Sequence, residues 1–261
     1  MRFFFSFSLN KLFFGPVLFF FALAHVFKFI RFYLVLMEEK ELAFFDILFL
    51  YVRTTFVNLI IPFKLGEIYR VAAVKHMTGF YKTGILLVVI DRFFDTLALL
   101  ALTLPFELLF TRGADPVLTL LFAALLFMLF VYLSFKPTYD YLNGYLIMKK
   151  RSKRSMALLN VLDIANEWYL FLRKLIRGRS PLVFMASLLG WGMEFAALKL
   201  FASSLDSSFD INAFIQYINS LLSGGRSFTG SAYNLMGIVI FGIMTVILCV
   251  EWQNRKGKKT A

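Results

Sequence analysis

The chain has 261 residues, of which 60% are hydrophobic and 18% aromatic, and a mean hydropathy of +0.75, which is typical of an integral membrane protein and excludes an ordinary soluble domain. The formal net charge of +12 comes with no nucleic-acid-binding motif, so we attribute it to membrane topology and expect no nucleic-acid partner. A single cysteine excludes an intrachain disulfide, the two histidines are far apart in sequence, and we expect neither a metal nor a cofactor.

The first apolar run extends from Leu12 to Met37, enough to cross a hydrocarbon core that needs about 20 residues. Its basic start and the Ala-Leu-Ala at residues 22–24 are also features of a cleavable signal peptide. Because the apolar run continues well beyond them, we predict a retained helix. Lys28 and Arg31 lie toward its far end, where we expect their long side chains to reach the headgroup region.

The second apolar segment, Phe44 to Ile61, is interrupted by Asp46, Arg53 and Asn58. A segment this short and polar is tolerated in a membrane only where protein or a water-filled cavity shields it. We therefore predict that it packs inside the protein.

A break follows at Pro62 and Gly66. Proline disfavours the helical conformation of the residue before it, and glycine permits backbone turns that other residues resist. From Leu65 to His76 the pattern predicts a short interfacial helix, which carries Glu67 and Arg70 three residues apart.

The next long apolar run, Gly84 to Phe110, carries Asp91, Arg92 and Asp95. Each charge at the centre of a bilayer costs about 2.5–3.5 kcal/mol on insertion scales, so such residues usually pair and usually mark a functional site. Two carboxylates against one arginine leave a negative excess, which requires a second cation.

We predict that these three residues form one cluster with Glu67 and Arg70 at the inner part of the membrane. That set holds three acids and two arginines. Neutrality then requires a further cation, for which Arg53 is available, or a proton on one acid.

Val117 to Phe135 is apolar throughout and predicts a spanning helix. Residues 136–181 then carry ten basic and three acidic residues, which predicts a cytoplasmic loop by the positive-inside rule. Within this loop, Met156 to Ile176 has the pattern of an amphipathic helix lying on lipid, and a solvated connector is the alternative.

Leu182 to Phe201 predicts another span and contains Trp191 and an internal Glu194. The apolar segment Ile211 to Leu222 is too short to cross and ends in a glycine-rich break, so we predict a re-entrant half-helix that packs near the first break, around Asn58 to Glu67. The final apolar run, over 232–252, predicts the last span.

Loop charges alternate in sign along the chain, as six crossings require. The sequence thus predicts an all-α polytopic integral membrane protein with about six transmembrane helices plus broken or re-entrant segments, and with both termini in the cytoplasm. We expect one membrane domain over residues 1–261. Its parts are an N-terminal helical half (12–135), the basic loop (136–181), a C-terminal helical half (182–252) and a basic tail (253–261).

An internal repeat is possible. The Phe-Asp-Ile at 45–47 recurs at 209–211, and the same offset of 164 residues aligns Gly66 with Gly230. Transporters often carry such duplications, in which discontinuous helices meet at a central site. Chance similarity is the alternative.

The pattern Pro-x-x-x-Gly-Glu-x-x-Arg followed by Arg-x-x-Asp resembles the transmembrane region of lysylphosphatidylglycerol synthases, a flippase-like family that also occurs as free-standing membrane proteins. The similarity covers roughly residues 12–110 and is looser afterwards. Asp91 stands where the family usually has Glu, and residues 223–231 lack the Pro and Glu of the family's second motif. The matching residues are Pro62, Gly66, Glu67, Arg70, Arg92 and Asp95, with Trp191 and Glu194 in a weaker later pattern.

The resemblance implies movement of a phospholipid or polyprenyl-linked lipid between the leaflets of a bacterial-type cell membrane. No polar segment could be the aminoacyl-transferase domain of the full synthases, so we do not expect this chain to make the lipid. The alternative is a non-transporting accessory subunit of a membrane glycosyltransferase or lipid-modification system.

We expect no catalytic activity, because no nucleophile–base pair or metal-ligand spacing is visible, and no ATP hydrolysis, because no Walker-type phosphate loop is present. The expected partners are a membrane lipid, anionic or polyprenyl-linked, and either a glycosyltransferase or a second copy of the chain. The predicted headgroup groove consists of Arg53, Asn58, Pro62, Gly66, Glu67, Arg70, Asp91, Arg92, Asp95 and Glu194.

Overall fold

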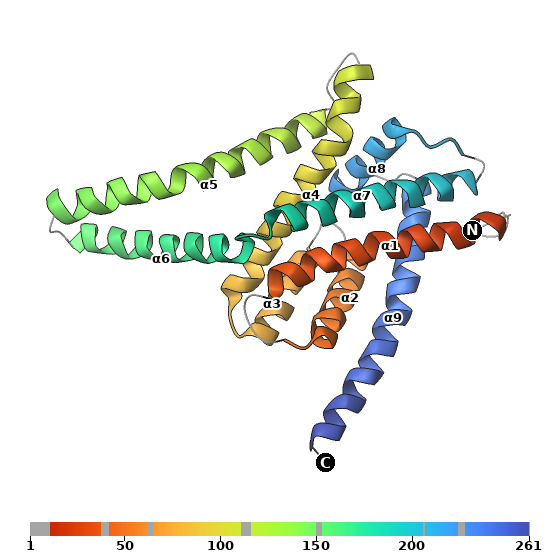
Figure 1. Ribbon diagram of the computed structural model, residues 1–261, viewed down its shortest axis with the longest axis horizontal. Helices are drawn as coiled ribbons and strands as arrows, with labels where there is room; N and C mark the ends of the chain where they lie inside the picture. The colour runs from red at the N-terminus through yellow and green to blue at the C-terminus, as the bar shows by residue number, and fades with distance from the viewer. Residues whose placement is uncertain are drawn as a thin grey trace.

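The computed structural model describes residues 11–37, 42–61, 65–110, 116–149, 153–205, 207–223 and 228–260. All regular secondary structure in these ranges is helical, which confirms the predicted all-α membrane fold (Figure 1). The helices are α1 (Lys11–Leu36), α2 (Phe44–Ile60), α3 (Gly66–Thr78), α4 (Tyr81–Phe110), α5 (Pro116–Lys149), α6 (Lys153–Ile176), α7 (Ser180–Ser203), α8 (Ile211–Ser223) and α9 (Phe228–Thr260).

Four helices within the described ranges are long and apolar enough to cross a membrane by length and composition. The two further crossings predicted from sequence fall on α2 and α4. Helix α2 has 17 residues, fewer than the about 20 that a bilayer core requires, and charges interrupt α4. The number of crossings therefore stays a prediction. The four candidate spans are Gly15–Leu36, Pro116–Met148, Ser180–Ser203 and Thr229–Arg255.

The basic stretch at 136–181 is mostly helix. Helix α5 continues past Phe135, and α6 folds back along it, as Figure 1 shows. Aromatic contacts hold the two together, with the rings of Phe135 and Tyr169 centred 5.0 Å apart. The Tyr139 hydroxyl also donates a hydrogen bond to Asp163 Oδ1 over 2.9 Å. The predicted helix at 156–176 is confirmed, and its placement on lipid stays a prediction.

Helices α1 and α7 pack side by side and run in opposite directions. Arg179, at the start of α7, donates a hydrogen bond to the carbonyl of Leu34 near the end of α1, at 3.0 Å. Farther along, Arg31 contacts Ser187, and Lys28 contacts Glu194. Along this contact the residue numbers decrease on α1 while they increase on α7, so the two helices are antiparallel (Figure 1).

This arrangement corrects the predicted topology, in which both of these helices run from the inside outward. Since they are antiparallel, the end of α1 and the start of α7 lie at the same level of the protein. The prediction failed because it scored the charge of each loop separately, and loop charge carries no information about which helix ends are neighbours. The side of the membrane on which each terminus lies stays a prediction.

The order of a long helix, a short helix and a break occurs twice, in α1–α2 and in α7–α8. The antiparallel long helices have the relation expected of inverted repeats in transporters. Helix α8 packs Phe214 against Trp191 and Phe195 of α7. The end of α2 is instead contacted by α9, whose Asn234 donates to the Leu59 carbonyl at 3.5 Å. The hydrogen bond at the end of α2 is thus made by the start of α9 and not by α8, the neighbour predicted from sequence.

Cysteine labelling tests the antiparallel pair. On a Cys249→Ser background, cysteines at the exposed positions Met37 and Arg177 should react with a membrane-impermeant reagent from the same side of a sealed vesicle. A cysteine at exposed Lys199, near the other end of α7, should react from the opposite side. Labelling of positions 37 and 177 from opposite sides would contradict the arrangement.

Candidate functional site in a charge-balanced polar pocket

A pocket of about 330 Å³ lies where α1, α2, α3, α4, α7, α8 and α9 meet. Eight charged side chains line it, four of each sign, and we call it the polar pocket. Its cations are Lys28, Arg31, Arg70 and Arg92, and its anions are Glu67, Asp91, Asp95 and Glu194.

The close approach of α2 and α3 places Glu67 in this pocket. Gly66 lies directly against Asn58, and a Cβ atom at position 66 would come within 2.7 Å of the Asn58 Cα. A real Cβ atom does not fit at that distance, so the first turn of α3 requires glycine here. Asn58 Nδ2 then donates to Glu67 Oε1 across 3.4 Å.

Arg70, one turn along α3, connects this helix to α4. Its Nη1 donates to Asp91 Oδ2 at 2.8 Å and lies 3.2 Å from Glu67 Oε2. The Arg70 and Asp91 side chains are 7% and 8% exposed, so the pair is screened little by solvent. Sequence analysis placed these residues in one cluster, and the structure brings them together.

Arg92 is the most exposed ionic residue of the polar pocket. Its side chain is 34% exposed, whereas Glu67 and Asp95 are each 14% exposed. It forms an ion pair with Glu67, and its Nη1 lies 3.8 Å from Asp95 Oδ2. Among the four cations it is therefore the one most accessible to an incoming anion.

Arg31 is the further cation that neutrality of the cluster requires, a role that the sequence predicted for Arg53. Its side chain is only 4% exposed and forms ion pairs with both Asp91 and Asp95, the first at 2.5 Å. Its Nη1 also donates to Ser187 Oγ at 3.0 Å, which ties α1 to α7 as well as to α4.

Arg53 lies elsewhere, so its predicted role is corrected. Its guanidinium carbon is 5.2 Å from the centre of the Tyr69 ring and 6.0 Å from that of Phe49, and it does not line the polar pocket. The prediction relied on proximity in sequence to the first break, and α2 turns this residue toward aromatic neighbours.

Lys28 and Glu194 form an ion pair between α1 and α7. Tyr217 of α8 donates to Glu194 Oε1 at 3.1 Å. The Lys28 ammonium lies 5.0 Å from the ring centre of Trp191, whose Nε1 donates to Asp95 Oδ1 at 3.0 Å. Trp191 therefore links this pair to the acids of α4.

The expectation that Lys28 and Arg31 reach the headgroups is wrong. Both turn inward because buried acids on neighbouring helices offer them direct partners. A signal was present in the sequence: with His25, they are spaced three residues apart along α1, which places them on one helix face. His25 also lines the pocket and lies 3.1 Å from the Tyr51 hydroxyl.

The pocket is neutral by formal charge without a proton on any acid, because Lys28 and Arg31 were missing from the sequence-based count. Of the ten predicted groove residues, Pro62 lies outside the described residues, Arg53 lies away from the pocket, and Gly66 sits at the contact between α2 and α3. The remaining seven line the pocket together: Asn58, Glu67, Arg70, Asp91, Arg92, Asp95 and Glu194.

The family model for the lysylphosphatidylglycerol synthase transmembrane region matches residues 7–229. The chain belongs to this family. The match extends far past residue 110, where the similarity noted from sequence became loose, and it includes all eight charged residues of the polar pocket. No curated protein and no solved structure matches the chain. Membership in this family and the four apolar helices establish a membrane protein with a lipid-related function.

Stability measurements test the role of Arg31. Arg31→Gln should lower the free energy of unfolding by about 3–5 kcal/mol, because it leaves Asp91 and Asp95 buried with too little positive charge. The matched variant Arg53→Gln removes the same charge from a residue outside the polar pocket and should lower the free energy of unfolding much less. Thermal unfolding in detergent gives the comparison, and equal losses would contradict the assignment.

Proposed function

We propose that this protein moves a membrane lipid between leaflets and that the lipid headgroup passes through the polar pocket. The observation that carries the proposal is the set of eight ionic side chains that lines a cavity among apolar helices. Ionisable groups within the membrane are expensive, and they usually mark the path of a polar substrate. Family membership supports a lipid as that substrate.

Arg92 is the residue we assign to the lipid phosphate. It is the most exposed cation of the pocket, and its buried Nε makes no hydrogen bond with the described residues. The guanidinium fork can present two parallel donors to a phosphate. The same holds for the buried Nε atoms of Arg31 and Arg70, so the arginines retain donors beyond those used in their ion pairs.

Charge balance restricts the headgroup further. Since the pocket is already neutral, a headgroup with a net charge would leave that charge uncompensated in a poorly screened site. A headgroup that carries a phosphate together with an ammonium group avoids this cost. We therefore favour a zwitterionic phospholipid over the anionic or polyprenyl-linked lipid expected from sequence, with Glu67 and Glu194 as candidate acceptors for the ammonium.

The position of the two helix breaks beside the polar pocket supports the proposal. Residues on both sides of the first break, Asn58 and Glu67, line the same pocket as Tyr217 and Tyr233, which flank the second. In transporters with repeated halves, substrates bind where such discontinuous helices meet.

One observation favours a second candidate, a non-transporting accessory subunit of a glycosyltransferase or lipid-modification system. Every charged residue of the pocket has an oppositely charged partner, so the network can also lock the helices together without any ligand. Neither proposal assigns catalysis to these side chains.

A flipping assay with purified protein in liposomes tests the proposal. Glu67→Gln and Arg70→Gln, which each remove one charge from the pocket, should slow the movement of a fluorescent zwitterionic phospholipid about tenfold or more, equivalent to ~1.4 kcal/mol of barrier. The control Glu251→Gln is the same Glu-to-Gln substitution, made in an exposed ion pair at the far end of α9, and it should leave the rate unchanged.

Two outcomes would contradict the proposal. If both pocket variants transport as fast as the unmodified protein, the ionic network is structural and the site assignment fails. If the unmodified protein moves no lipid unless a glycosyltransferase partner is present, the accessory function replaces it.

A further inference from the structure

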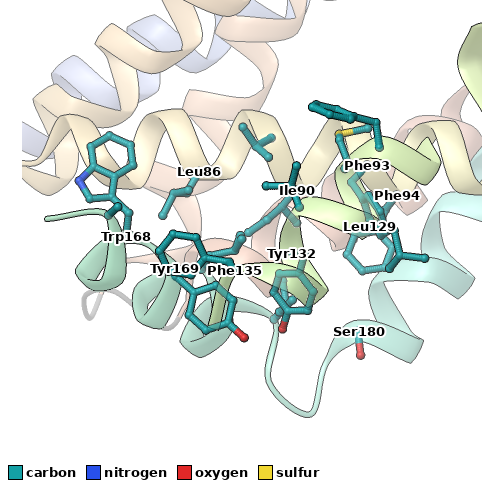
Figure 2. Close-up of a pocket in the computed structure, with 17 residues that line it drawn as sticks. Leu86, Ile90, Phe93, Phe94, Leu129, Tyr132, Phe135, Trp168, Tyr169 and Ser180 are labelled. Atoms are coloured by element: carbon teal, nitrogen blue, oxygen red, sulfur yellow. The ribbon is translucent and has the colours of Figure 1, made fainter. Parts of the chain in front are cut away.

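A second, apolar cavity of about 530 Å³ lies between α4, α5 and α6. Figure 2 shows Leu86 and Ile90 of α4 on one side and the adjacent rings of Tyr169 of α6 and Phe135 of α5 on the other, with Trp168 of α6 beside Leu86. Its lining contains no charged side chain. We call it the apolar cavity.

The apolar cavity is separate from the polar pocket. Ile90 and Phe94 of α4 face the apolar cavity, whereas Asp91 and Asp95, the next residues along the chain, face the polar pocket. Because neighbouring residues point to different sides of a helix, α4 forms a wall between the two spaces. The cavity is therefore not part of the proposed headgroup path.

The mouth of the cavity opens toward lipid. On α5, Phe127, Leu129 and Val131 line the cavity and are 66%, 40% and 45% exposed. They belong to the apolar span Pro116–Met148, whose most apolar part is almost entirely unburied by the rest of the protein. In a bilayer the material outside this mouth is hydrocarbon, so a lipid chain can enter without crossing water.

One end of the cavity has a basic rim. On α6, Arg173 is exposed, follows the lining residue Tyr169 by one helical turn and lies near Tyr132, which lines the cavity from α5. From α4, the Lys82 ammonium lies 5.0 Å from the centre of the Phe171 ring, beside the same turn of α6. We call Arg173 and Lys82 the basic rim. An apolar cavity with two cations at its edge matches an amphiphile with an anionic head, and basic pockets between membrane helices bind such lipids.

We propose that the apolar cavity holds a hydrocarbon chain of one anionic phospholipid, whose phosphate is bound by the basic rim. This lipid is distinct from the transported one, because it lies on the other face of α4. It would fill the space between α4 and the α5–α6 hairpin. The proposal concerns binding alone and does not depend on whether the protein transports.

Trp168 provides the measurement, because it lines the cavity and is one of three tryptophans in the chain. The difference in fluorescence between the unmodified protein and Trp168→Phe isolates its signal. Phosphatidylglycerol with brominated chains should quench this signal and saturate at a low mole fraction in liposomes of unbrominated phosphatidylcholine. Brominated phosphatidylcholine should quench it only weakly.

Variants separate the contributions of the rim and the cavity. Lys82→Gln/Arg173→Gln should raise the mole fraction of anionic lipid needed for half-maximal quenching about 30-fold, on the order of fivefold for each basic residue. The control Lys199→Gln/Arg255→Gln removes the same charge from exposed positions on α7 and α9 and should change nothing. Ala165→Phe, which fills the cavity, should reduce quenching while leaving the rim intact.

Two results would overturn the proposal. Equal quenching by both brominated lipids, unchanged in the rim variant, would mean that the cavity merely exchanges with bulk bilayer lipid. The absence of quenching by either would mean that something other than lipid, such as a second copy of the chain, covers it. Should Ala165→Phe fail to fold, the rim variant still decides, because it leaves every lining residue of the apolar cavity unchanged.

Discussion

The buried guanidinium of Arg31 is the interaction on which the arrangement of the helices depends. It forms ion pairs with Asp91 and Asp95 and donates to Ser187, so one side chain joins α1 to α4 and α7. Charges in a poorly screened interior are costly unless their partners are correctly placed, so a shift of any one helix would strand several of them. The ionic network therefore fixes the register of the bundle as well as lining its polar pocket.

Helix α4 lines both the polar pocket and the apolar cavity, because successive residues of a helix point to different sides. Its acids and Arg92 face the polar pocket, and its Ile90 and Phe94 face the apolar cavity. A lipid has the same division between a polar head and an apolar chain, and family membership independently indicates a lipid-related function. Any movement of this helix would change both spaces together, so occupancy of one site is expected to influence the other.

The charges of the polar pocket favour a zwitterionic over an anionic headgroup. The sequence-based count held more acids than bases and required a proton or Arg53 for neutrality. The structure adds Lys28 and Arg31, and the pocket becomes neutral with every acid ionised. A neutral pocket with donors and acceptors of both signs suits a headgroup that carries both signs itself.

The sequence by itself determined most of the helices, the break before Gly66 and most of the polar cluster, because apolar run length and charges within apolar runs are local properties. It did not determine that α5 continues as a helix past Phe135 into the predicted basic loop. It did not determine that Arg31 completes the cluster, that Arg53 lies outside it, or that α1 and α7 are antiparallel. Those depend on which helices become neighbours. Pairing between distant helices decides whether an arginine near a helix end turns to the headgroups or inward, and only the tertiary structure provides that pairing.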